Sequence, residues 1–103
     1  MDEVKIYDKA ISHYGIKHQL LMVMEECSEL SKECSKVYRA LDEGGTFRID
    51  GLAEEIADVQ ITTGQIQRFF GLKDKVKEQR KGKLRRLAER INNENDESET
   101  DIP

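Results

Sequence analysis

The chain has 103 residues, of which 37% are apolar and 37% are charged, with one proline and no tryptophan. This composition excludes a large hydrophobic core and favours one small, all-α domain over a β-rich one. No apolar run approaches the roughly 18 residues that a membrane-spanning helix needs, and no signal peptide is recognised. We therefore expect a cytoplasmic protein without a membrane partner.

The net charge of -4 is unevenly distributed. Five of the 21 acidic residues and none of the 17 basic residues fall in residues 92–103, which leaves 16 acids in residues 1–91. The final segment is polar and has no apolar period, which is typical of disorder. The sequence predicts a near-neutral helical domain over residues 1–91 and a disordered acidic tail over residues 92–103.

Apolar residues recur at helical spacing in four segments. The predicted helices cover residues 2–14, 17–41, 50–70 and 74–91. Gly15, Gly71 and either Gly44 or Gly45 are predicted to end helices, and Asp50 is predicted to cap the third helix at its N-terminus. Short connections favour a four-helix antiparallel bundle-like protomer, and its small core favours a dimer or larger helical bundle.

Two cysteines, Cys27 and Cys34, lie seven residues apart on the second predicted helix. Two helical turns separate them by about 10.5 Å, which exceeds the roughly 7 Å between the Cα atoms of a disulfide. We expect reduced thiols, with Cys27 buried and unreactive.

Two short acidic signatures stand out, one in each central helix. They are Glu25-Glu26-x-x-Glu29 and Glu54-Glu55-x-x-Asp58. On a helical wheel Glu29 lies about 60° from Glu26, on the side that also carries the apolar residues. Carboxylates on a core-facing stripe repel one another unless a cation neutralises them, and oxygen-only ligands favour Mg²⁺, with Mn²⁺ as the alternative.

These acids have two other interpretations. Paired glutamates often belong to a solvated helix face with salt bridges to nearby lysines. A di-iron site would need a Glu-x-x-His motif, which neither His13 nor His18 completes. These histidines are expected to be surface or packing residues.

The fourth predicted helix is basic. Nine lysines and arginines and three acids lie between Lys73 and Arg90. Such a helix suits the phosphates of a polyphosphate substrate, although a solvated face or nonspecific nucleic-acid attraction would use the same residues. The helix has none of the aromatic interleaving or zinc-ligand spacing that would favour sequence-specific nucleic-acid binding.

With both acidic signatures in view, residues 16–91 resemble the MazG-like, all-α nucleoside triphosphate pyrophosphohydrolases, in particular their short phage and bacterial members. The resemblance implies Mg²⁺-dependent hydrolysis of a nucleoside triphosphate between its α and β phosphates, giving a monophosphate and pyrophosphate. It also implies a homodimer or homotetramer. The alternative is a non-catalytic helical protein that binds a nucleotide or a partner for regulation.

The resemblance assigns roles to particular residues. The implied metal ligands are Glu26, Glu29, Glu55 and Asp58. Glu25 and Glu54 lead the two motifs and would support these ligands or orient the attacking water. The implied substrate-binding residues are Gln19, for the base or sugar, and Arg80, Lys81, Lys83 and Arg86, for the phosphates.

Overall fold

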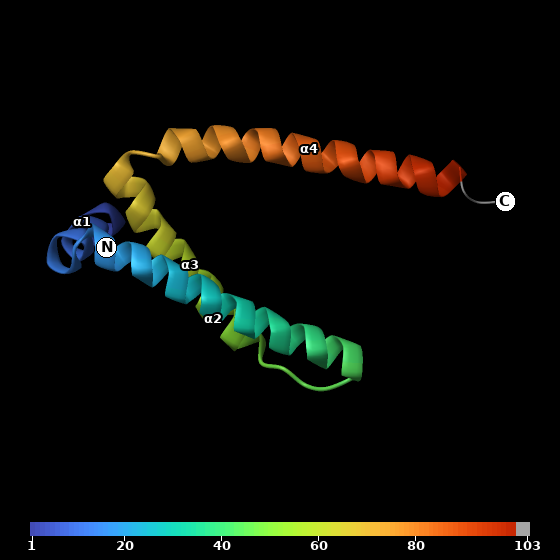
Figure 1. The fold of residues 1–103 in the computed structure, drawn as a ribbon, viewed down its shortest axis with the longest axis horizontal. Coiled ribbons are helices and arrows are strands. Elements are labelled where there is room, and N and C mark those ends of the chain that lie inside the picture. Colours follow the sequence, from blue (N-terminus) through green and yellow to red (C-terminus); the bar gives the residue numbers. More distant parts are fainter. Residues whose placement is uncertain (101–103) are drawn as a thin grey trace. The chain divides into compact units, whose positions relative to one another are not determined.

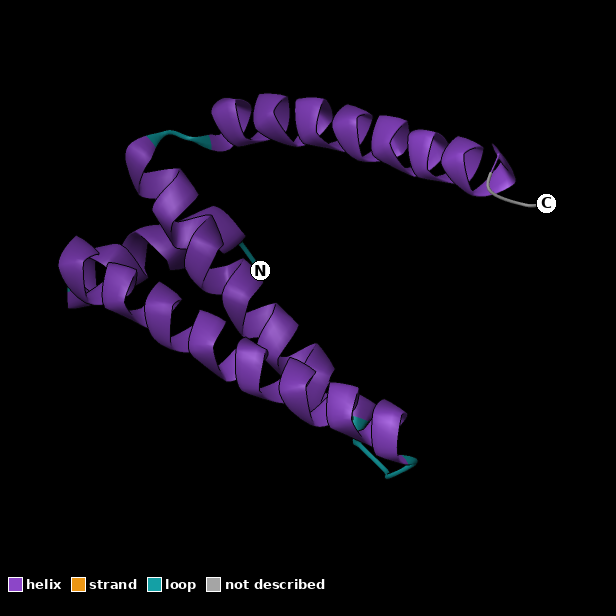
Figure 2. Cartoon of the chain, turned by 45° about the vertical axis from the view of Figure 1, so that its right-hand side comes forward, coloured by secondary structure: helices purple, strands orange, loops and turns teal. Residues whose placement is uncertain are grey.

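The computed structural model describes the backbone of residues 1–100 and the side chains of residues 1–95. Its four helices are α1 (Glu3–Tyr14), α2 (Ile16–Glu43), α3 (Ile49–Phe70) and α4 (Lys73–Thr100) (Figure 1). Short loops join them, and residues 1–100 contain no strand (Figure 2). The prediction of an all-α chain of four helices is confirmed. The chain divides into two units, Met1–Gly71 and Leu72–Pro103.

Glycines end the helices where the sequence predicts. Gly44 follows α2 with φ of 75°, and its N–H donates to the carbonyl of Ala40. Gly71 ends α3 in the same left-handed conformation, with φ of 62°. Glycine adopts this conformation without the strain that a Cβ would add, so both stop signals are confirmed.

The predicted N-cap of the third helix is wrong. Arg48 occupies the cap position of α3 without a side-chain hydrogen bond, and the helix begins at Ile49. Asp50 instead lies in the first turn, where its negative charge complements the helix dipole. The side chain of Asp2 does cap α1, because it accepts a hydrogen bond of 3.2 Å from the backbone N–H of Lys5.

The fourth helix is longer than expected. It continues past Ile91 to Thr100, where the sequence predicted a disordered tail. No glycine or proline interrupts residues 92–100, and their glutamates are compatible with a helix. Residues 101–103 of the predicted tail lie outside the described residues.

In the first unit, α2 and α3 lie side by side in opposite directions (Figure 1). Gln19 bonds to Gln65, Glu26 meets Asp58, and the carboxylate of Glu33 lies where a Cβ of Gly51 would be. Each step of seven residues up α2 thus corresponds to seven residues down α3. Seven residues rise about 10.5 Å, so polar layers recur at that spacing along the interface.

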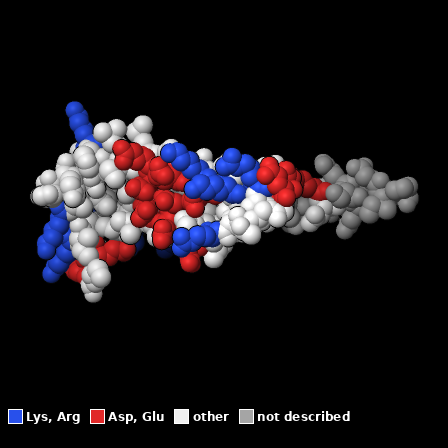
Figure 3. Space-filling model, turned by 90° about the horizontal axis from the view of Figure 1, so that it is seen from below, with Lys and Arg blue, Asp and Glu red and all other residues white. Residues whose placement is uncertain are grey.

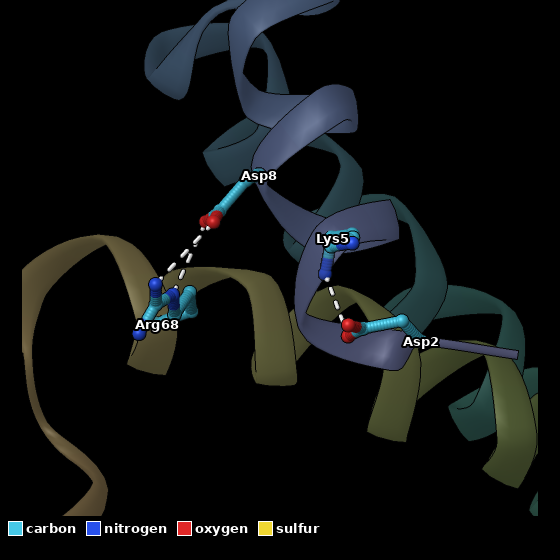
Figure 4. Close-up of polar contacts among 4 residues, drawn as sticks. All are labelled: Asp2, Lys5, Asp8 and Arg68. Carbon is cyan, nitrogen blue, oxygen red and sulfur yellow. Dashed lines mark hydrogen bonds and ion pairs between the residues drawn. The ribbon is translucent and has the colours of Figure 1, made fainter.

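Helix α1 packs mainly against α3. A Cβ at Gly64 would lie 2.8 Å from the ring of Tyr7, so this glycine lets the aromatic ring approach the helix. Farther along, Arg68 binds both carboxylate oxygens of Asp8, at 3.1 and 3.3 Å (Figure 4). Both partners are about half exposed, so this ion pair orients α1 more than it stabilises the fold.

The single chain encloses very little apolar surface. Among the described side chains, Ala40 is the only buried apolar residue, and the other two buried residues are Gln19 and Gln65. Met24, Tyr38 and other large apolar side chains remain more than a third exposed. The expectation that Cys27 is buried is also wrong for the single chain, because both cysteines are exposed.

Candidate metal centre

Three carboxylates converge between α2 and α3. Glu26 lies on α2, two turns after Gln19, and Glu55 and Asp58 lie one turn apart on α3. One oxygen from each of the three lies within 4.8 Å of the others. Acidic side chains form a patch on one face of the molecule, bordered by lysines and arginines (Figure 3). The antiparallel register therefore brings both acidic signatures together.

The surroundings of these carboxylates disfavour their charged forms. Partial burial raises the pKa of Glu26 above 4.5, and the charges of Asp58 and Glu55 raise it further. A side-chain hydrogen bond with Asp58 raises the pKa of Glu26 in the same direction. The pKa of Glu55 is raised first by burial, then by the charges of Asp58 and Glu29. Like charges in a half-buried position are what a bound cation would relieve.

One oxygen of this group has no protein partner. Glu55 Oε2 is buried and accepts no hydrogen bond from any described residue. An unpaired buried carboxylate oxygen is costly, because it has lost water without gaining a donor. A hard cation at about 2.0–2.6 Å from each oxygen would supply the missing partner, and oxygens around such a cation lie about 3–5 Å apart. The three residues therefore fit a Mg²⁺ or Mn²⁺ ion.

The fourth predicted ligand lies at the edge of this group. Glu29 is half exposed, and its carboxylate binds Lys32 at 3.2 Å. Its charge still raises the pKa of both Glu26 and Glu55. The leading acids of the two motifs, Glu25 and Glu54, are exposed. The structure thus gathers three of the four predicted ligands and leaves Glu29 outside the group, bound to Lys32.

Gln19 occupies an interior position. Its side-chain amide donates to Gln65 Oε1 at 2.6 Å, and its own Oε1 contacts His18 Nδ1 at 2.7 Å. His18 in turn stacks on Tyr14, with ring centroids 5.1 Å apart. The pair of glutamines lies one layer, about 10.5 Å, from Glu26 and Asp58 and links α2 to α3.

The predicted phosphate-binding residues all lie on α4, in the second unit. Arg80, Lys81, Lys83 and Arg86 are exposed. Arg80 and Lys83 flank the apolar side chains of Leu84 and Leu87, which form a shallow hollow along the helix. Lys83 and Arg86 are three residues apart and share one side of α4, as expected.

Two features near the acidic group were not predicted as site components. The first is Glu33, whose carboxylate faces Gly51 and binds Lys36 at 2.9 Å. The second is an open hollow of about 840 Å³ that Glu33 shares with Phe47, Arg39 and Arg48 at the C-terminal end of α2. The position of Glu33, seven residues after Glu26, was the sequence signal for the first. No sequence pattern indicates the hollow, because it depends on the path of the loop after α2.

Comparisons with protein-family models, with curated proteins and with solved structures gave no match. Within the described part of the chain, no helix combines the length and the apolar character that crossing a membrane requires.

Proposed function

We propose that this protein is a MazG-like hydrolase, which cleaves a nucleoside triphosphate between the α and β phosphates with the aid of Mg²⁺, or of Mn²⁺. The products are a nucleoside monophosphate and pyrophosphate. The observation that carries the proposal is the convergence of Glu26, Glu55 and Asp58 within 4.8 Å, with one oxygen of Glu55 buried and unpaired.

The acidic residues divide the work at this site. Glu26, Glu55 and Asp58 hold the cation, and Glu29 completes the set by turning away from Lys32. When bound, Mg²⁺ neutralises charge on the triphosphate and makes water a stronger nucleophile near neutral pH. Glu25 and Glu54, one position before Glu26 and Glu55, orient the attacking water or support the ligands.

Basic residues bind the anionic substrate in this proposal. Lys83 and Arg86 contact the phosphates and offset the charge that develops on the departing pyrophosphate, with Arg80 and Lys81 beside them. Gln19 holds α2 against α3 in this proposal, since its side-chain amide is already bonded to Gln65. The earlier assignment of Gln19 to the base or sugar would require that bond to break.

We also propose that the protein is a cytoplasmic homodimer or homotetramer. The support is energetic: only one apolar residue, Ala40, is buried among the described residues of a single chain. Fully burying one large apolar side chain contributes about 1.5–3 kcal/mol. Association would gain this energy from side chains that a lone chain leaves in water.

The second candidate is a helical protein that binds nucleotides or a partner without catalysis. The open hollow at the end of α2 favours it, because Lys36, Arg39 and Arg48 line it beside Glu33 and Glu43 and could hold an anionic ligand there, apart from Glu26, Glu55 and Asp58. Such a protein would bind a nucleotide and leave its triphosphate intact.

The test is a panel of ribonucleoside and deoxyribonucleoside triphosphates incubated with the protein and Mg²⁺, with pyrophosphate as the readout. At least one should release pyrophosphate, and Asp58→Asn and Glu26→Gln should each lower the rate at least 100-fold while far-ultraviolet circular dichroism stays unchanged. Glu89→Gln removes an exposed acid on α4 and serves as the matched control, with activity retained.

Each result separates the two candidates. Binding of a nucleotide with no turnover by the unmodified protein would support the non-catalytic alternative. Turnover that survives both Asp58→Asn and Glu26→Gln would refute the assignment of the site.

A further inference from the structure

Helix α2 carries two stripes with the alternating three- and four-residue spacing of a heptad seam. The first runs from Gln19 to Ala40, and all its members are buried or half-buried on the side that faces α3. The second is shifted by one residue and runs from Leu20 to Leu41. One residue corresponds to about 100° around the helix, so the second stripe faces away from α3.

The second stripe is apolar at both ends and exposed throughout. Leu20, Met24, Tyr38 and Leu41 are 39, 67, 71 and 73% exposed, respectively. Cys27, Ser31 and Cys34 occupy its middle and are also exposed. An exposed heptad stripe of this length marks an interaction surface. Its apolar side chains leave water only when the helix packs against a partner.

The order of residues in this stripe is nearly the same from either end. A leucine lies at each end, a large side chain follows, then a cysteine, and Ser31 is at the centre. A two-fold interface requires such self-complementarity, because residue i of one copy contacts residue j of the other and the reverse holds as well. The small central side chains allow two helices to approach closely where they cross.

Charge favours the antiparallel direction. Lys17 and Asp42 lie near opposite ends of the stripe, on its flank away from α3. In an antiparallel pair the same flanks meet, so Lys17 comes near Asp42 of the partner subunit at both ends. A parallel pair would bring identical ends, and therefore like charges, together.

We propose that the stripe from Leu20 to Leu41 docks against the same stripe of a second copy, antiparallel, with the two-fold axis at Ser31. Leu20 then packs against Leu41 of the partner subunit, and Cys27 lies near Cys34 of the partner subunit. This surface is independent of the catalytic proposal and would exist in a non-catalytic protein as well.

Light scattering on the full chain tests the surface. The unmodified protein should have at least twice the mass of one chain, and Met24→Glu should shift it to the monomer. Ile49→Glu is the matched control, because Ile49 is 64% exposed but lies on α3, outside the stripe, and it should leave the mass unchanged. A monomeric unmodified protein, or dissociation by Ile49→Glu alone, would overturn the proposal.

The thiol oxidant diamide tests the direction. It should cross-link the unmodified chain, whereas Cys27→Ser and Cys34→Ser should each lose the cross-link, because neither variant retains a facing pair. Mixing the two variants should restore a cross-linked dimer through the remaining Cys27 and Cys34. Cross-linking by either variant alone indicates a parallel pair and rejects the antiparallel axis, as does failure of the unmodified chain to cross-link.

Discussion

Glu26 and Glu55 carry an electrostatic penalty that neighbours across the α2–α3 interface impose. Burial and the charge of Asp58 raise the pKa of both, and Glu55 additionally has an oxygen without a donor. A folded protein that keeps such a group favours whatever neutralises it, either a proton or a cation. A proton at low pH and a divalent cation near neutral pH would therefore compete for the carboxylates of Glu26 and Glu55.

This competition predicts how pH affects the metal-free protein. Below pH 4.5, these glutamates are protonated in both the folded and the unfolded chain, and the folded state carries no penalty from them. As pH rises past 4.5 and then through their raised folded-state pKa, the folded chain comes to bear the full repulsion, so their contribution to stability falls. In EDTA, Glu26→Gln should melt several degrees above the unmodified protein at pH 7 and at the same temperature at pH 4.

Thermal melts followed by circular dichroism at both pH values measure this difference. Glu89→Gln should show no such pH-dependent gain, since Glu89 is an exposed acid outside the cluster. A gain for Glu26→Gln that is equal at pH 4 and pH 7 would contradict the electrostatic explanation.

Single residues also show how far the sequence predicts the site. Glu26, Glu55 and Asp58 were found because their spacing places them on core-facing stripes of two helices. Glu29 shares that spacing, yet its carboxylate binds Lys32 on the surface, because local rotamer choices are not encoded in periodicity. The bond between Gln19 and Gln65 was missed since it depends on the register between two helices, 46 residues apart in sequence.

At the scale of the elements, periodicity locates helices but does not choose the face that each one buries. The lengths of α1, α2 and α3 follow from apolar spacing and from Gly15, Gly44 and Gly71. Helix α2 has two heptad stripes one residue apart, and sequence alone cannot say which one faces α3. The expectation that Cys27 is buried was wrong for this reason, because it lies on the other stripe.

The contact between α1 and α3 leads to a prediction about Gly64. A Cβ there would lie 2.8 Å from the ring of Tyr7, so Gly64→Ala forces the ring or the helix to move. Such overpacking costs about 1–3 kcal/mol, which outweighs the roughly 0.5–1 kcal/mol that replacing a helical glycine by alanine otherwise gains. Urea unfolding should therefore show a less stable Gly64→Ala protein.

Gly82 provides the matched control for that substitution. It also lies inside a helix, α4, but nothing lies within 4 Å of the position of its Cβ. Gly82→Ala should raise helicity and stability slightly, by about 0.5–1 kcal/mol. Equal effects of the two substitutions would show that Tyr7 does not restrict Gly64.

At the scale of the whole molecule, the exposed apolar surface is the dominant feature. Composition predicted a small core and hence an assembly, and the single chain buries even less than expected, with Ala40 as its only buried apolar residue among those described. The extent of this burial could not be predicted, because the polar side chains of Gln19, Gln65 and Glu26 occupy positions along the α2–α3 interface that a leucine would normally fill. These polar side chains place the candidate metal site between α2 and α3, while the leucines of α2 remain exposed.

A dimer formed through the exposed stripe of α2 would make the stability of the fold depend on protein concentration. If folded chains associate and unfolded chains do not, mass action favours the folded assembly by about 1.4 kcal/mol for each tenfold rise in concentration. The melting temperature should accordingly rise by several degrees between micromolar and hundred-micromolar protein, and Met24→Glu should remove most of that dependence. Ile49→Glu should retain it. A melting temperature of the unmodified protein that stays constant over this range would show that one chain folds stably alone, and the apolar stripe of α2 would then need another explanation.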